Sequence, residues 1–494
     1  MAGTPRSLQE WVARLGSARL PVLAGSVEAL ARLKEHEDDV VARDISRVIL
    51  RDPMLTLSVL IVLQTRRPNR RIVDITTIEH AIMMMGVSPF FRQFHDLPVV
   101  EDVLAAKPVA LRGFMAVAAR ARHAAVHART WAGLRCDIES DEVVIAALLH
   151  DMVELLIWFF APHLTLEIAE RMQSDATLRS AAVQRAVLGF PIGELQSALC
   201  HEWQMPELLK SLMDEQHAHQ PRARNALLAV ALARHSAHGW RDAALPDDLV
   251  EIGELLGLPR EEVGKNIYRA ELFAIAELHH YGADADAIWL PPLPLFFGNY
   301  AAWMRGAPHG LAPLLLEQVL DYLSGSAAAG PALPALLDHP NATAEDIARI
   351  DAIAYALNGI HAGLGFDRVL WLDMNGADAL SGPRYVVGGQ GAEKLRDLRH
   401  TAGSDPELGR LLLSLRDAGD FAQLQQQLPA LLREAIKNRN PTSEFVAMPL
   451  LAGRSGNWSL IYADGAACHA DPDFDVPAQF RTMVLALEAR LNDF

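Results

Sequence analysis

The first 280 residues contain predominantly apolar segments of about ten residues, the length of a short helix. Short polar stretches separate these segments. Several of these stretches follow a residue whose side chain can cap a helix, such as Ser7, Asp52 and Thr77. Gly86 follows another stretch and can end a helix in a left-handed conformation. The pattern predicts a compact all-α domain over residues 1–280.

The most apolar run in this part of the chain covers residues 143–161 and is about long enough to cross a membrane. His150, Asp151 and Glu154 lie near its middle, where lipid would make charged side chains costly. We therefore predict a buried helix that carries these three side chains in a single polar sector. The methionine run at residues 83–85 is likewise predicted to lie in a helix core.

The pattern changes after residue 280. Residues 281–340 contain the proline-broken run IWLPPLPLFFG and the stretch SGSAAAGPALPA, which predict a connector packed against the helical domain and then a linker. Thr343–Asp346 resembles a capping box, and strand-like alternation follows in GFDRVLWLDMNG. Two more strand candidates, EFVAMPLLAG and NWSLIYADG, come after helical stretches. An α+β domain on an antiparallel sheet is predicted for residues 341–494.

Charge and cysteine content narrow the class of protein. The formal net charge is −16, which repels phosphate backbones, so no direct nucleic-acid partner is expected. Three widely spaced cysteines fit a reducing compartment and exclude a disulfide framework or a cysteine-based zinc site. The first residues lack the apolar segment of a secretory signal. We expect a soluble cytoplasmic protein with no membrane partner.

Five phrases of the first domain, taken in order, resemble the HDOD domain, a variant of the HD phosphohydrolase superfamily found in bacterial signalling proteins. The order begins with LPVLAGSVEALARL, ISRVILRDPMLTLSVLIVL and ITTIEHAIMMMGVSPFFRQF, and it continues with AALLHDMVELL and HEWQMPELLKSL. The resemblance covers roughly residues 15–240 and implies an HDOD-like multi-helix bundle. It also implies a non-catalytic regulatory or interaction role in signal transduction.

The phrases LNGIHAGLGFDRVLWLDMNG and VAMPLLAGRSGNWSLIYADG resemble the start and end of a GAF-like domain, an α+β module that senses small molecules. This resemblance implies a GAF-like antiparallel sheet with helices in the C-terminal domain. It also implies a small-molecule ligand there, of the cyclic nucleotide class.

An HD-type metal centre takes an upstream histidine, a His–Asp pair and a later aspartate, which together hold a divalent cation that activates water. His123, His150 and Asp151 are the candidates for three of these ligands. The family comparison places the fourth ligand at or near Arg234, whose permanent positive charge would repel the metal.

The same residues can be explained without a metal. Buried polar groups must be hydrogen-bonded, and His123 or His127 facing Asp151 would satisfy both partners. Arg234 would then supply the positive charge that a metal once supplied. This interpretation predicts no catalytic residues, no cofactor and a vestigial polar cluster composed of His123, His127, His150, Asp151, Glu154 and Arg234.

The sequence thus predicts a non-enzymatic signalling protein that couples a sensed input to a protein partner. The alternative is a metal-dependent phosphohydrolase or phosphodiesterase that acts at His123, His150 and Asp151. A third hypothesis is a scaffold without any ligand.

Overall fold

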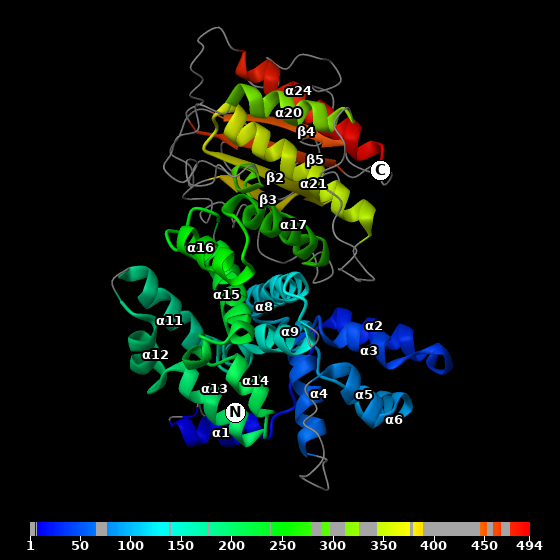
Figure 1. The fold of residues 1–494 in the computed structure, drawn as a ribbon, viewed down its shortest axis with the longest axis vertical. Helices are drawn as coiled ribbons and strands as arrows, with labels where there is room; N and C mark the ends of the chain where they lie inside the picture. Colours follow the sequence, from blue (N-terminus) through cyan, green and yellow to red (C-terminus); the bar gives the residue numbers. More distant parts are fainter. Residues whose placement is uncertain are drawn as a thin grey trace. The chain divides into compact units, whose positions relative to one another are not determined.

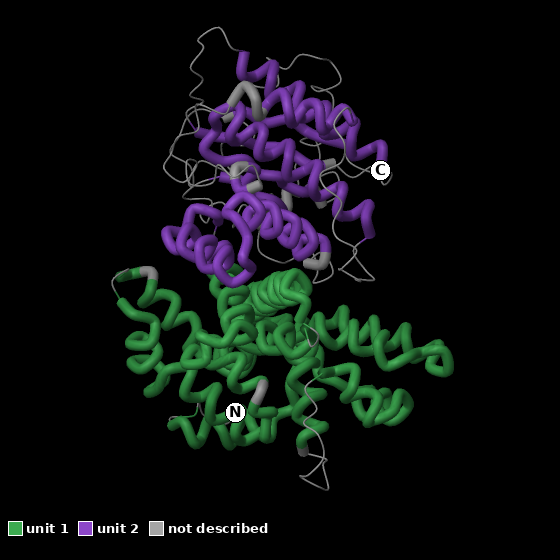
Figure 2. Tube along the Cα trace, in the orientation of Figure 1, with its two compact units in different colours: residues 1–234, 278–285 green, residues 235–277, 286–494 purple. Residues whose placement is uncertain are grey.

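The computed structural model describes most of the chain and divides it into two compact units (Figures 1 and 2). The first unit comprises residues 1–234 and 278–285, and the second comprises residues 235–277 and 286–494. The described residues are 5, 7–65, 77–137, 140–175, 178–237, 239–278, 288–296, 312–325, 343–375, 379–388, 445–451, 458–465 and 475–494.

The first unit is built mainly of helices within its described residues, in agreement with the sequence pattern. Its α-helices are α1 (Leu8–Gly16), α2 (Ala24–Lys34), α3 (Ala42–Ile49), α4 (Pro53–Thr65), α5 (Ile78–Met85), α6 (Val87–Gln93), α7 (Val100–Leu104), α8 (Pro108–Leu134), α9 (Ser140–Leu149), α10 (Met152–Phe160), α11 (Pro162–Ser174), α12 (Ser180–Leu188), α13 (Ile192–Glu202), α14 (Glu207–Leu212) and α15 (Pro221–Ser236), whose last two residues belong to the second unit. Short 3₁₀ turns, η1 (Glu37–Asp39) and η2 (Glu215–His217), lie between them.

The predicted helix ends are found where the sequence placed them. The Ser7 side chain accepts a hydrogen bond from the Glu10 amide, and the Thr77 side chain accepts one from the His80 amide. Asp52 accepts hydrogen bonds from the amides of Met54 and Leu55 at the start of α4, and its other oxygen accepts one from Leu23. Asp52 therefore ties the segment that enters α2 to the first turn of α4.

The apolar run is helical and mostly buried, as predicted, but it is interrupted. The run at residues 143–161 is not one helix, because α9 ends at Leu149, α10 begins at Met152, and the His–Asp pair lies in the break. By length and composition, residues 140–160 could cross a membrane, yet 78% of the most apolar window is buried within the fold, as in the core of a globular protein.

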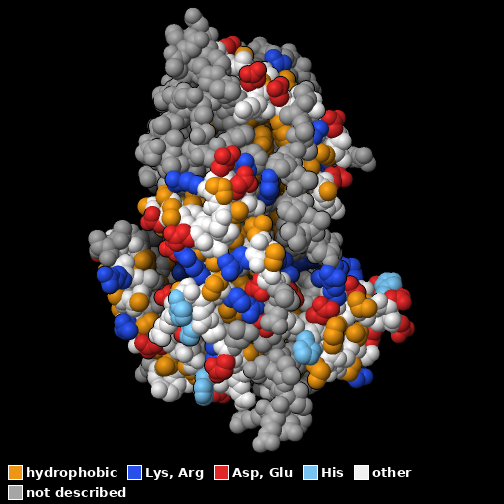
Figure 3. Space-filling model, viewed as in Figure 1, with side chains coloured by type: hydrophobic (Ala, Val, Ile, Leu, Met, Phe, Trp, Pro, Cys, Tyr) orange, Lys and Arg blue, Asp and Glu red, His pale blue; other side chains and the backbone are white. Residues whose placement is uncertain are grey.

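The methionine run is also not a core element. Met83 is 62% exposed and Met84 is 59% exposed, because α5 turns its other face, with Ile78, Ala81 and Ile82, toward the interior. Figure 3 shows hydrophobic side chains (orange) among charged ones over the part of the first unit that carries α2, α3, α5 and α6.

The second unit combines helices with a small sheet. Its elements are α16 (Leu245–Leu256), α17 (Arg260–Leu278), β1 (Ile288–Trp289), α18 (Leu293–Phe296), α20 (Ala312–Leu323), α21 (Ala344–Asn358), the π-helical turn η4 (Gly359–Gly363), β2 (Arg368–Asn375), β3 (Ala379–Gly388), β4 (Phe445–Leu451), β5 (Trp458–Asp464) and α24 (Val476–Asn492). Within the described residues, the strand order is β1-β3-β2-β5-β4, and all neighbours are antiparallel except β1 and β3.

The division of the chain differs from the predicted boundary at residue 280. Tyr268, Leu272 and Ile275 of α17 lie in the same hydrophobic core as α20, α21, α24 and one face of the sheet. The predicted connector at 281–340 also contributes to this unit, since β1 pairs with β3 and Leu293 is fully buried in that core. The helical stretches predicted before the last two strand candidates lie outside the described residues.

A buried carboxyl group joins three helices of the second unit. Tyr268 of α17 and Tyr322 of α20 donate hydrogen bonds of 3.2 and 2.7 Å to the two oxygens of Asp351 on α21. Tyr355 stacks on Tyr322 with 4.2 Å between ring centroids. Burial raises the pKa of Asp351 to about 6, although both hydroxyl hydrogen bonds oppose the rise.

Further along, His361 of η4 is buried, with Nδ1 2.6 Å from the Phe366 carbonyl oxygen. Burial lowers its pKa to about 4, against the effect of that hydrogen bond.

Candidate functional site

The candidate site forms where α9 and α10 pack on the long helix α8. Small side chains allow the close approach, since Ala121 and Ala125 of α8 form a buried cluster with Val144 and Leu148 of α9. On the adjoining part of α8, a Cβ atom at Gly113 would lie 2.5 Å from the ring of Trp158 on α10. The sequence therefore brings the α9–α10 break against α8 through its smallest residues.

Asp151 is the centre of the site. Its Oδ2 atom accepts hydrogen bonds from Nε and Nη2 of Arg120, at 3.2 and 3.0 Å. Its Oδ1 atom accepts hydrogen bonds from Nη2 of Arg234 at 3.0 Å and from Nδ1 of His150 at 2.9 Å. Since a carboxylate only accepts, Nδ1 of His150 carries the proton. Both oxygens of Asp151 are thus engaged by permanently charged guanidinium groups.

Arg120 also binds a second carboxylate. Its Nη2 atom donates to Oε2 of Glu154 at 2.6 Å, so one guanidinium serves Asp151 and Glu154 together. The Arg120 and Asp151 side chains are 17% and 9% exposed, whereas the Arg234 side chain is 52% exposed. Two arginines and two carboxylates balance in charge, and the interior pair is the one between Arg120 and Asp151.

The electrostatics follow from this arrangement. Burial alone would raise the pKa of Asp151, but the His150 hydrogen bond and the charges of Arg120 and Arg234 outweigh it and hold that pKa well below its usual range. Burial works to lower the pKa of Arg120, and the charges of Glu154 and Asp151 outweigh it, so the pKa of Arg120 is raised. Asp151 and Arg120 are therefore both charged at neutral pH.

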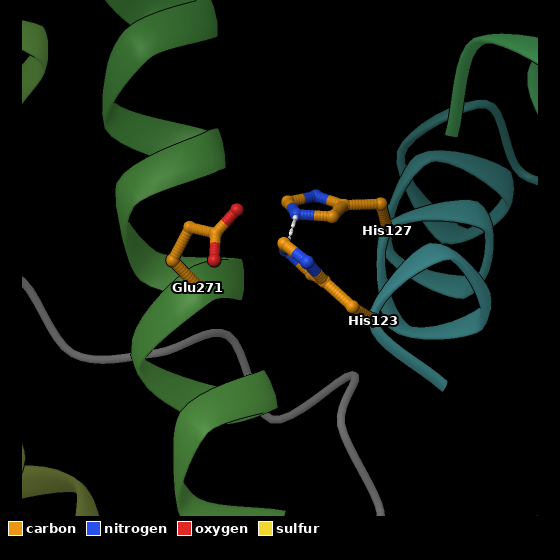
Figure 4. Close-up of side chains that lie close together, drawn as sticks. All are labelled: His123, His127 and Glu271. Carbon is orange, nitrogen blue, oxygen red and sulfur yellow. Dashed lines mark hydrogen bonds between the residues drawn. The ribbon is translucent and has the colours of Figure 1, made fainter. Parts of the chain in front are cut away.

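The predicted polar cluster is only partly as expected. The structure brings His150, Asp151, Glu154 and Arg234 together, with Arg234 bonded to Asp151. The expected pairing of His123 or His127 with Asp151 is wrong, because the two histidines bond to each other through their Nε2 atoms, 3.1 Å apart (Figure 4).

Sequence reasoning missed Arg120. Its spacing from His123 could have identified it, because a residue three positions before His123 lies on the same side of α8. What the sequence did not show is that the break after Leu149 lets the Asp151 carboxylate reach this arginine.

The donor set does not fit an HD-type divalent metal at Asp151. A metal there would have to displace a guanidinium from the carboxylate and would then lie beside two fixed positive charges. The Glu154 carboxylate offsets part of this charge through its bond to Arg120, but the four hydrogen bonds to Asp151 occupy both of its oxygens.

Residues 20–219 match the family model of the HDOD domain. No curated protein matches the chain. Among solved structures, the chain is similar to the MmoQ response regulator of Methylococcus capsulatus strain Bath, at 22% identity over 51% of this chain and 98% of that one, with a TM-score of 0.39. A fragment of the same regulator matches at 22% identity over 50% and 94%, with a TM-score of 0.38.

A virulence factor from Campylobacter jejuni matches at 16% identity over 53% of this chain and 97% of that one, with a TM-score of 0.39. The family match is what bears on the site. Residues 20–219 thus carry the pattern of the HDOD domain, a family of HD-like domains generally considered non-catalytic.

Proposed function

We propose that this chain is a non-catalytic signal-transduction protein of the bacterial cytoplasm, in which the HDOD-like part presents a surface to a protein partner. The observation that carries the proposal is the occupation of both Asp151 oxygens by Arg120 and Arg234. An aspartate held in this way has no oxygen available to ligate a metal that activates water. The HDOD match of residues 20–219 supports the signalling role.

The second unit is proposed to be the sensing part, with a GAF-like fold and a small-molecule ligand of the cyclic nucleotide class. Its four antiparallel strands, with α20, α21 and α24 packed in one core with the sheet, support this assignment. An input received there would change the surface that the helical part offers to its partner.

The catalytic alternative gives a direct test. The full chain is incubated with Mn²⁺, Mg²⁺ or Fe²⁺ and with bis(p-nitrophenyl) phosphate or cyclic nucleotides, beside the Asp151→Asn variant. We expect no metal-dependent hydrolysis by either protein. Turnover that depends on the metal and disappears in Asp151→Asn would show a working phosphohydrolase and overturn the proposal.

The sensing part has its own test. Thermal unfolding of the full chain is followed with cyclic dinucleotides and, as a control, with their linear hydrolysis products. A ligand that binds only the folded state raises the melting temperature. A rise with the cyclic forms alone supports the proposed ligand class, and equal curves with both sets would remove it.

A further inference from the structure

The pair of imidazoles on α8 does not take part in the Asp151 cluster described above. His123 and His127 lie one turn apart on the same face of the helix, and their ring centroids are 4.9 Å apart (Figure 4). His127 is fully buried and its ring lies 5.4 Å from that of Trp131, whereas His123 is partly exposed. The inner ring is thus buried against Trp131 and the outer ring is partly exposed.

The Nε2 atoms of the two rings are 3.1 Å apart. A metal bound by two imidazoles has nitrogen ligands at about 2.0–2.1 Å, so two neighbouring nitrogens are about 2.9 Å apart in square geometry and about 3.3 Å apart in tetrahedral geometry. The observed separation lies between these values. The separation of the two nitrogens therefore suits one shared ion, which would replace the hydrogen bond between the rings.

We propose that His123 and His127 form a chelating site for a divalent transition metal of the Cu²⁺, Ni²⁺ or Zn²⁺ type. Imidazole nitrogens suit these ions, whereas Mg²⁺ and Mn²⁺ prefer oxygen ligands. The site differs from an HD-type centre because it uses neither His150 nor Asp151. Water or other donors would complete the coordination of the ion, and the site does not depend on the proposed function.

The positive charge of Arg120 does not oppose this site. Arg120 lies one turn before His123, but its charge is balanced by its bonds to Asp151 and Glu154. The two arginines that exclude a metal from the Asp151 carboxylate are therefore compatible with a metal at the imidazole pair.

The test is metal titration of the full chain, purified without a histidine tag. Cu²⁺ binding is measured by competition with a chromophoric chelator, beside His123→Ala and the control His217→Ala. His217 is a good control because it belongs to another histidine pair, with His219, whose rings are 6.4 Å apart. We expect one site that weakens roughly tenfold or more in His123→Ala, since the second imidazole acts at high effective concentration, and no change in His217→Ala.

Electron paramagnetic resonance of the Cu²⁺ complex gives a second readout. Wild type should show coupling to two imidazole nitrogens and His123→Ala to fewer, and the signal should be lost on acidification because protonated imidazole does not bind metal. The buried His127 is probed in the same way with His127→Asn only if that variant folds. Equal Cu²⁺ affinity in wild type and His123→Ala, or loss of binding in His217→Ala, would overturn the proposal.

Discussion

Replacing Arg120 with methionine removes the cation that serves both Asp151 and Glu154 while keeping most of the side-chain bulk. Breaking a buried ion pair by removing one partner costs about 3–5 kcal/mol, because the other charge is left uncompensated. Arg120 and Asp151 are 17% and 9% exposed, and Arg234 still binds Asp151, so we expect a cost near the lower end, about 3 kcal/mol.

The same substitution at Arg234 should cost much less. Its side chain is 52% exposed, and exposed ion pairs contribute only about 0–1 kcal/mol. The matched control is Arg171→Met, which breaks an exposed pair with Glu167 one turn away and should change stability by less than about 0.5 kcal/mol. The expected order of destabilisation is Arg120, then Arg234, then Arg171.

Urea denaturation measures the order, with hydrogen exchange in peptides from α8 and α10 as the local readout. A double-mutant cycle with Arg120→Met and Asp151→Asn should show coupling of about 1–3 kcal/mol. The pKa of Asp151 is lowered in the folded state, so its contribution is present at neutral pH and is lost as the pH falls below about 4. An Arg234→Met cost equal to that of Arg120→Met, or no coupling between Arg120 and Asp151 at neutral pH, would refute this account.

Three further predictions concern the two cores. The pKa of Asp351 in the folded protein is about 6, above its ordinary value of 3.8. Protonation of this group therefore stabilises the second unit by about 3 kcal/mol in all as the pH falls from 6 to 4. The Asp351→Asn variant should lack this gain in stability. The folded pKa of about 4 for His361 lies below its ordinary 6.5, so this group costs stability over nearly the same range, and His361→Asn should remove that cost. The measurement is the urea midpoint of unfolding as a function of pH between 4 and 7, followed by hydrogen exchange in peptides from β2. The midpoint should change little with pH in wild type and should change in opposite directions in the two variants. Changes in the same direction in both variants would contradict both assignments. On α8, Gly113→Ala should cost about 1–3 kcal/mol because its Cβ would lie 2.5 Å from the Trp158 ring, whereas Gly133→Ala, with no neighbour within 4 Å, should be neutral or slightly stabilising by thermal melting.

Much of the fold could be predicted because local rules decided it. Caps at Ser7, Thr77 and Thr343 lie where a short polar side chain precedes an apolar stretch. The alternation around Trp371 predicted β2 because one face of that strand lies in the helix-covered core. In these places the chain's local preference and its tertiary environment agree.

The failures occurred where a tertiary contact decided the outcome. Composition alone could not show that the helix stops at Leu149, nor that Met83 and Met84 face outward. The sequence predicted that Arg234 balances the charge of Asp151. It did not predict the hydrogen bonds between Arg120 and Asp151, because these depend on how α8 packs against the break between α9 and α10. The sequence pattern alone did not show which residues that are distant in sequence contact each other in the fold.

The order of strands in the second unit has a consequence for how the protein is made. The centre of the sheet is the β2–β5 pair, in which Trp371 lies opposite Ile461, and the core is filled by Phe480 and Leu487 of α24. The apolar face of α17, with Tyr268, leaves the ribosome long before these partners exist. The helices of the first unit can pack against one another during translation. The second unit cannot complete its core until α24 has been synthesised. Until then its exposed apolar residues can aggregate or bind chaperones.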